Sequence, residues 1–227
     1  MSTLNDFFNP GVTPTNPMDG GSTSNEFRPS PKKGQNGVYE AVIRFLPNPA
    51  DPANKSMIQK FTAYIMDPRN GQKRAIDDPR SIGQQSIIGN TFFALRNSGN
   101  PILTENSKQF SSKLSIYSLV QVLTCKSEPQ LEGKILVWRY GMKVLEKINA
   151  EITPPMGQGH NPFNLLTGRP FSLRVKEVSG FPNYDACGFF DLPINQSGLR
   201  IQYPDATGTM QWSVVTPETV STQQGQQ

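Results

Sequence analysis

The clearest structural signal in this chain is the stretch at residues 171–185, which reads FSLRVKEVSGFPNYD. Over residues 171–176 apolar and polar side chains alternate, and this pattern predicts a half-buried β-strand at 171–178. Arg174 and Lys176 are two residues apart, so the strand would point both cations to the same face. The residues that follow include Gly, Pro and Asn, and they predict a turn that presents Phe181 and Tyr184.

Two cations beside two aromatic rings suit a polyanion with flat bases, because cations attract phosphates and rings stack on bases. The same stretch is also typical of a surface strand with solvated cations, followed by aromatic residues that belong to the core. On its own, the stretch leaves both interpretations open.

Composition predicts a mainly β protein. The 227 residues are 35% hydrophobic and include 20 prolines and 19 glycines, which is typical of many short elements joined by turns. All-β domains of this length often fold undivided. No run of about 18 apolar residues occurs and the N-terminus lacks a basic and apolar signal, so we expect a soluble, unexported protein.

The net charge of +4 is small, but the charges are distributed unevenly. Residues 108–176 hold ten basic and four acidic side chains, whereas residues 177–227 hold one and five. A basic block is the footprint expected for phosphate contacts, although it also occurs in proteins without a nucleic-acid partner. Any cationic surface is therefore expected in the middle of the chain.

Catalytic and metal-binding patterns are weak. The two cysteines, Cys125 and Cys187, are far apart in the sequence, and His160 is the only histidine. We therefore expect free thiols rather than a disulfide or a metal site. No spacing of carboxylates or lysines marks a catalytic pair, and the protein is not expected to be an enzyme.

The two ends of the chain lack hydrophobic periodicity. Residues 1–36 are rich in Asn, Pro, Gly, Ser and Thr, and we expect a flexible N-terminal arm. Its apolar residues Leu4, Phe7 and Phe8 could dock on a neighbouring copy or on the same domain, or stay disordered. Residues 216–227 end in TQQGQQ and are expected to form a disordered tail.

Between the ends, residues 37–215 are expected to form the folded core. Strands are expected at 38–46, 58–66, 113–124, 134–140, 199–203 and 210–215, and a helix at 143–152. The strands at 38–46 and 58–66 are consecutive, so we expect them to pair as a hairpin. Residues 67–107 lose the alternation, apart from a helix-compatible stretch at 87–97, and are expected to form an insertion with solvated charges.

Three separated pieces of the chain resemble the single-stranded DNA-binding (helix-destabilising) proteins of T-even-type bacteriophages. They are VYEAVIRFLPNP at 38–49, GKILVWRYGMKVLEKINAEI at 133–152 and the stretch at 171–185, in the family's order and at comparable spacing. The resemblance covers residues 37–190. It implies an OB-like β-barrel with a subdomain inserted at 67–107, and a basic, aromatic-lined cleft that holds the DNA strand.

The resemblance also implies which residues contact that strand. Basic side chains fall on basic positions of the family, and aromatic side chains fall on or near its aromatic positions. Trp138 and Tyr140 replace other aromatic residues of the family, so stacking on bases could survive there. With the cations and rings that share strand faces, the candidate DNA-binding residues are Arg44, Lys60, Lys113, Tyr117, Trp138, Arg139, Tyr140, Lys143, Arg174, Lys176, Phe181 and Tyr184.

The implied function is sequence-independent binding and protection of single-stranded DNA during phage DNA replication, recombination and repair. Such a protein works without catalysis, in the cytoplasm of the infected bacterial host. A rival interpretation is a non-enzymatic phage structural or interaction module that binds protein partners through its arms.

Three features depart from the family. Its inserted subdomain usually carries zinc, but residues 67–107 hold no cysteine or histidine, so we expect no zinc or other cofactor and a subdomain held by packing. Its basic N-terminal segment supports cooperative binding between neighbours on DNA, whereas the arm here is neutral and longer. Its long acidic tail, which recruits replication partners, is reduced here to a short Gln-rich end. Self-association along DNA and phage replication proteins therefore stay open as partners.

Overall fold

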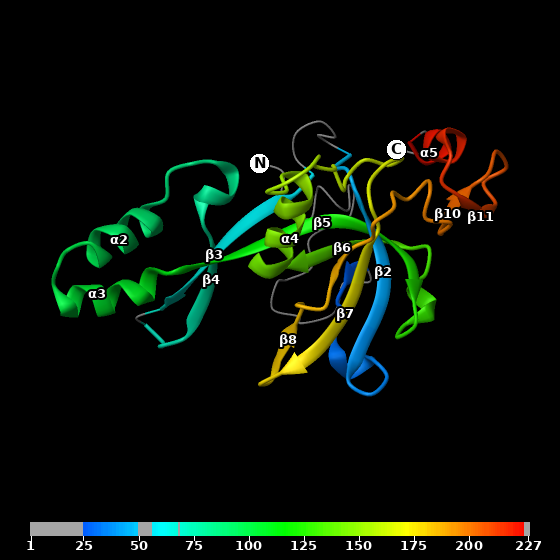
Figure 1. Cartoon of the computed structure of the whole chain (residues 1–227). Helices are drawn as coiled ribbons and strands as arrows, with labels where there is room; N and C mark the ends of the chain where they lie inside the picture. Colours follow the sequence, from blue (N-terminus) through cyan, green and yellow to red (C-terminus); the bar gives the residue numbers. More distant parts are fainter. Residues whose placement is uncertain (1–24, 50–55, 68, 225–227) are drawn as a thin grey trace. The chain divides into compact units, whose positions relative to one another are not determined.

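The computed structural model describes residues 25–49, 56–67 and 69–224, which form a mainly β protein with a few short helices (Figure 1). The strands are β1 (Glu26–Phe27), β2 (Val38–Leu46), β3 (Ile58–Met66), β4 (Lys73–Asp77), β5 (Ser112–Cys125), β6 (Ile135–Tyr140), β7 (Phe171–Val178), β8 (Phe181–Asn183), β9 (Gly188–Phe189), β10 (Arg200–Pro204) and β11 (Met210–Val214). The helices are α2 (Ile87–Arg96), α3 (Pro101–Ser107), α4 (Met142–Ile152) and α5 (Pro217–Gln224). Short 3₁₀ turns are η1 (Pro31–Lys33), η2 (Pro79–Ile82), η3 (Lys108–Phe110) and η4 (Pro129–Leu131). The mainly β class is confirmed, and no helix in the described ranges is long and apolar enough to cross a membrane.

Hydrophobic alternation located seven of the eleven strands in the described residues closely, whereas β1, β4, β8 and β9 were not predicted. β2, β3 and β7 coincide with their predicted ranges, and β5, β6, β10, β11 and α4 differ by no more than one residue at either end. In β7 the predicted inner residues Phe171, Leu173 and Val175 are at most 1% exposed, whereas Arg174 and Lys176 are exposed. Alternation is reliable here because one face of the strand packs on the core and the other meets solvent.

The chain divides into two compact units. The first comprises Met1–Ser56, Ser118–Trp138 and Ile148–Gln227, and the second comprises Met57–Tyr117 and Arg139–Lys147. The predicted insertion at 67–107 therefore lies inside a second unit that begins earlier, at Met57.

Strand β2 is central to the sheet of the first unit. The strand order is β1-β6-β5-β2-β7-β8, and β2 pairs antiparallel with both β5 and β7. The predicted hairpin between β2 and β3 is wrong, because β3 pairs antiparallel with β4 and with the first half of β5. Alternation assigns the two faces of a strand, but it carries no information about which strand lies beside it.

An aromatic cluster fills the core of the first unit. The ring of Trp138 is fully buried, and its centroid lies 6.0, 6.0 and 6.2 Å from the ring centroids of Phe27, Phe45 and Phe171. Phe27 belongs to β1, which pairs in parallel with β6. Residues 25–36, which were expected to belong to the flexible arm, thus contain a strand and a core aromatic residue. Leu4, Phe7 and Phe8 lie outside the described residues.

The segment predicted to be a disordered tail contains helix α5. Thr216 and Thr219 cap its start reciprocally: each hydroxyl oxygen accepts a hydrogen bond from the other residue's backbone N–H, at 2.9 and 3.3 Å. Val220 is 7% exposed and packs with Leu123, Ile194, Ile201 and Val215. This apolar side chain therefore joins the helix to a core cluster.

Within residues 57–117, the second unit combines β-strands with two short helices. β3 pairs with β4 and with the first half of β5, and side chains cap both helices. The hydroxyl oxygen of Ser86 accepts the N–H of Gly89 at 2.9 Å at the start of α2, and the Asn100 side chain accepts the N–H of Ile102 at the start of α3.

Candidate nucleic-acid interface

The first candidate surface lies on the outer face of β7 and β8, which with β2 form neighbouring strands of one sheet (Figure 1). We call it the hairpin surface and define it by Arg174, Lys176, Val178 and Phe181. The turn between β7 and β8 consists of Ser179 and Gly180, both with positive φ (51° and 80°). Two such residues form the tight turn that matches the twist of a hairpin.

Register puts the cations and the ring of this surface on one face. Phe181 pairs with Val178, and residues directly opposite each other in a ladder point to the same side. Val178 lies on the same side as Lys176 and Arg174 because strand side chains alternate. Phe181 is 75% exposed, so its ring stands in solvent beside the two cations. The sequence placed Phe181 in a turn, whereas it is the first residue of β8.

Tyr184 differs from Phe181. Its ring is half-buried, and the centroid lies 6.3 Å from that of Trp138. Burial raises the pKa of the Tyr184 phenol. Tyr184 thus packs against the core and offers only part of its surface to a ligand.

Glu40 partly neutralises the hairpin surface. Its Oε1 lies 3.5 Å from Nε of Arg174, and its Oε2 lies 3.3 Å from Nζ of Lys126. The side chains of Arg174 and Lys126 are still 56% and 80% exposed. Sequence reasoning missed Lys126, although it belongs to the basic block at 108–176. One carboxylate between two cations makes a site that a phosphate can enter by displacing it.

The second candidate surface lies on one face of β3 and β5 in the second unit. We call it the β3 surface and define it by Lys60, Tyr64, Lys113 and Tyr117. Lys113 lies opposite Thr62 in the ladder, and Tyr117 lies opposite Ile58. Alternation in β3 adds Lys60 and Tyr64 to the same face.

Exposure differs among the members of the β3 surface. Tyr64 is 51% exposed and Lys113 is exposed, whereas Lys60 and Tyr117 are half-buried. Nζ of Lys60 pairs with Oδ2 of Asp77 at 2.9 Å. Sequence reasoning missed Tyr64, although the alternation of residues 58–66 already placed it on the face of Lys60.

Arg139 and Lys143 also belong to the second unit and are exposed. Arg139 is at the end of β6, and Lys143 lies in the first turn of α4.

Three candidates lie in the core instead of on a surface. Arg44, Trp138 and Tyr140 are 3%, 0% and 4% exposed. Nε of Arg44 donates to Oε1 of Gln121 at 2.9 Å, and burial lowers the pKa of Arg44 to about 10. Trp138 and Tyr140 are inner-face residues of β6, and only Arg139 between them points outward. Because all three side chains are buried, the two candidate surfaces are defined without them.

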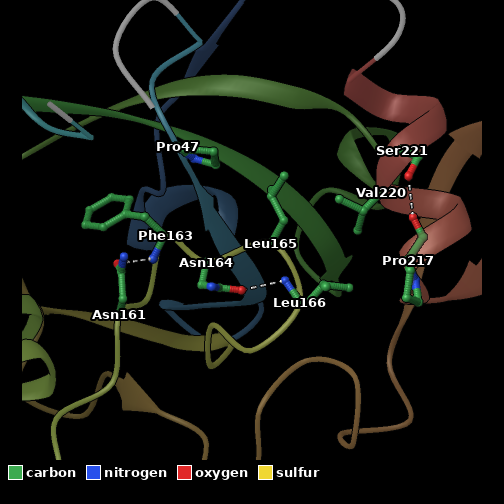
Figure 2. Close-up of a pocket in the computed structure, with 9 residues that line it drawn as sticks. All are labelled: Pro47, Asn161, Phe163, Asn164, Leu165, Leu166, Pro217, Val220 and Ser221. Carbon is green, nitrogen blue, oxygen red and sulfur yellow. Dashed lines mark hydrogen bonds between the residues drawn. The ribbon is translucent and has the colours of Figure 1, made fainter. Parts of the chain in front are cut away.

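A separate pocket of about 440 Å³ lies in the first unit, next to α5 (Figure 2). It is lined by Pro47, Asn161, Phe163, Asn164, Leu165, Leu166, Pro217, Val220 and Ser221. Figure 2 shows that the side-chain oxygens of Asn161 and Asn164 accept hydrogen bonds from the backbone N–H groups of Phe163 and Leu166. These two side chains therefore stabilise the loop at 161–166. None of the candidate DNA-binding residues lines this pocket.

Within the described ranges, no group of three or more His, Cys, Asp or Glu side chains is arranged to hold a metal ion. Cys125 and Cys187 are both buried, and neither forms a disulfide. A mainly β fold with exposed cations beside exposed rings on two sheet faces defines a candidate nucleic-acid-binding protein.

The chain belongs to the gp32 DNA binding protein like family, whose model matches residues 35–209. It is 34% identical over 108 residues to the single-stranded DNA-binding protein of Enterobacteria phage T4. The matched stretch covers 45% of this chain and 35% of the T4 protein. The chain is 33% identical over 108 residues to the single-stranded DNA-binding protein of Enterobacteria phage T2, 45% of this chain and 34% of that protein. The matched stretch thus spans about a third of either relative. The resemblance inferred from the sequence is confirmed.

Proposed function

We propose that this protein binds single-stranded DNA without strong sequence preference, using the hairpin surface and the β3 surface. The observation that carries the proposal is the 75% exposed ring of Phe181 on the same face as Arg174 and Lys176. A large apolar ring in solvent beside cations suits a ligand that supplies both a flat base and a phosphate. The relatives in phages T4 and T2 are named single-stranded DNA-binding proteins, which supports the proposal.

The physical mechanism needs no reaction chemistry. Cations track the phosphates, and each base that stacks on an aromatic ring contributes about 1–3 kcal/mol. A duplex hides the faces of its bases, so a protein of this kind prefers the open strand and shifts melting toward it by mass action. We therefore propose a non-catalytic role, in the protection of unpaired DNA during phage replication, recombination and repair in the host cytoplasm.

The proposal extends to fold and partners. The sheet of β1, β6, β5, β2 and β7 would be an OB-like barrel, and residues 67–107 would be the subdomain inserted in it. In favour of this, residues 67–107 lie inside the second compact unit, which consists of Met57–Tyr117 and Arg139–Lys147. Further copies of the chain along DNA and phage replication proteins would be its protein partners.

Titration of fluorescently labelled oligo(dT) with the full chain tests this function, with anisotropy as the readout at several salt concentrations. We expect log K to fall linearly with log salt, with a slope of about −0.7 for each phosphate neutralised. Tryptophan emission is a poor readout because Trp138 is fully buried and Trp212, which is 40% exposed, belongs to neither candidate surface. Affinity that is flat with salt, or equal for duplex and single strand, would contradict the proposal. Absence of binding would favour the structural or interaction module.

A further inference from the structure

We propose that the buried carboxylate of Asp78 is a positioning group for the β3 surface, which holds Lys60 and Lys113 in place through their strand neighbours. This inference rests on the proposed function. Asp78 itself is out of reach of DNA, because its side chain is 0% exposed.

Hydrogen bonds from Arg80, Ser112 and Ser86 surround the Asp78 carboxylate. Its Oδ2 accepts from Nη2 and Nε of Arg80 at 2.7 and 3.1 Å, and from the hydroxyl of Ser112 at 2.8 Å. Its Oδ1 accepts from the backbone N–H of Arg80 at 3.0 Å. These bonds, above all those from the Arg80 side chain, hold the pKa of the carboxyl well below its usual range. Asp78 is therefore ionised wherever the unit is folded near neutral pH.

The cluster joins two strands. The backbone N–H of Asp78 donates to the carbonyl of Phe61 at 2.9 Å, and the guanidinium carbon of Arg80 lies 4.7 Å from the centroid of the Phe61 ring. The N–H of Phe61 in turn donates to the hydroxyl of Ser81 at 2.8 Å. Asp78 and its neighbours thus fix β3 at Phe61 and β5 at Ser112.

Phe61 and Ser112 immediately adjoin the two lysines of the β3 surface. Because side chains alternate along a strand, the Asp78 cluster contacts one face of β3 and β5, while Lys60 and Lys113 project from the other. The ladder that pairs Thr62 with Lys113 sets the spacing of these cations. A shift of either strand would change that spacing, which has to match successive phosphates.

Apolar packing in this part of the second unit is sparse. Among the described residues of 57–117, the buried hydrophobic side chains are Ala63 and Ile116. The buried polar and charged ones are Asp78, Ser86, Ser107 and Ser115. The hydrogen-bonded carboxylate of Asp78 therefore contributes stability that a larger hydrophobic core would otherwise supply.

The test compares oligo(dT) binding by the full chain and by Asp78→Asn over a range of salt concentrations. An asparagine has about the same shape, but an NH2 group replaces one of the two carboxylate oxygens. The NH2 group can only donate, so the side chain no longer accepts all the hydrogen bonds from Arg80 and Ser112. For each phosphate that the displaced lysines no longer neutralise, we expect binding at 0.1 M salt to weaken by about fivefold and the slope to flatten by about 0.7. Simple electrostatics predicts the opposite sign, since the substitution removes a negative charge.

Asp191→Asn is the matched control. It makes the same charge change at an exposed aspartate of the first unit, and its affinity should equal or slightly exceed that of the unchanged chain. In a chain that already carries Lys60→Ala and Lys113→Ala, Asp78→Asn should have little further effect on affinity. A purely structural role would weaken binding in both backgrounds.

Three outcomes would overturn the inference. If Asp78→Asn is folded by circular dichroism and amide exchange of β3 and keeps its affinity and slope, Asp78 does not position the cations. If it fails to fold, Ser112→Ala removes one donor and leaves the carboxylate in place. That variant should bind about threefold more weakly, and unchanged binding would overturn the inference. If the unchanged chain does not bind oligo(dT), the proposed function fails first and this inference falls with it.

Discussion

At the scale of single residues, exposure separates side chains that look equivalent in the sequence. Phe181, Tyr184 and Trp138 are all aromatic and close to cations, yet they are 75% exposed, half-buried and fully buried. A base can stack only on a ring whose face meets solvent. Phe181 is therefore the aromatic residue of the first unit on which binding should depend most.

Phe181→Ala should weaken oligo(dT) binding by about 1–3 kcal/mol, because one stacking platform is removed. Thermal stability should hardly change, since the ring is 75% exposed. Anisotropy titration and thermal unfolding measure the two effects. Leu192→Ala removes another exposed apolar side chain, which is 52% exposed, and should leave affinity unchanged. Equal effects of the two substitutions would exclude a specific role of Phe181.

Glu40→Gln should tighten binding, because it removes the carboxylate that competes with phosphate for Arg174 and Lys126. Exposed ion pairs contribute little to folding, so stability should shift by no more than about 1 kcal/mol. The salt slope should steepen. Asp191→Asn changes the net charge equally and again serves as the control. The same gain in both variants would mean that net charge alone is responsible.

At the scale of secondary-structure elements, the ionised carboxyl residue Asp78 links elements of the second unit by hydrogen bonds. Asp78 connects η2, β3 and β5, and this arrangement gives a definite dependence of stability on pH. Hydrogen bonds from Arg80, with those from Ser86 and Ser112, lower the pKa of Asp78 in the folded state. A carboxyl whose pKa is lowered on folding stabilises the protein above its unfolded pKa, about 3.9, and loses that contribution in more acidic solution.

Asp78→Asn should therefore lower the free energy of unfolding of the second unit by about 1–3 kcal/mol near pH 7, because it removes one buried acceptor atom while the Arg80 side chain is 31% exposed. The difference from the unchanged chain should stay constant down to about pH 4 and shrink below it. Chemical denaturation followed by circular dichroism at several pH values measures it. A difference that grows with acidity would contradict the assigned ionisation.

Helix α5 should stabilise the first unit. Val220→Ala is expected to lower the free energy of unfolding by about 1–2 kcal/mol, because it leaves a cavity against Ile201 and Val215. Affinity for oligo(dT) should not change, since Val220 lies outside both candidate surfaces. Ser221→Ala, at an exposed position of the same helix, is the control. Equal stability of Val220→Ala and the unchanged chain would show that the helix does not stabilise the core.

At the scale of the whole molecule, each unit carries its own set of cations and rings. The hairpin surface belongs to the first unit and the β3 surface to the second. If both contact DNA through independent side chains, their contributions should add as free energies.

The double variant Phe181→Ala and Tyr64→Ala should therefore weaken binding to a long oligo(dT) by the product of the two single effects. Each ring is more than half exposed, so all three variants should fold normally. Anisotropy titrations on one oligonucleotide measure the cycle. A double variant no weaker than Phe181→Ala would remove the β3 surface from the interface.

Much of this protein can be predicted from its sequence alone. Alternation between core and solvent fixes where strands begin and end, which is why β2, β3 and β7 match their predicted ranges. The same alternation put Arg174 and Lys176 together on one face of β7. In β3 it also put Tyr64 on the face of Lys60. The family was inferred from three short stretches of sequence, at 38–49, 133–152 and 171–185. Their order and spacing can be compared with those of the family without knowing which strands pair.

Other features depended on contacts between residues far apart in the sequence. The pairing of β3 with β5, the burial of Phe27 beside Trp138 and the docking of Val220 on Ile201 all join distant segments. The sequence predicted that the ring of Trp138 stacks on a DNA base, but the ring is buried in the core. Whether other residues cover the apolar face of a strand depends on tertiary packing, which alternation does not reveal. The sequence by itself determined the strands of six or more residues, their faces and the family. Only the tertiary structure decided which candidate rings and cations, including those of 171–185, are exposed to solvent. The exposure of a side chain depends on the residues that pack around it, and the local sequence does not specify these.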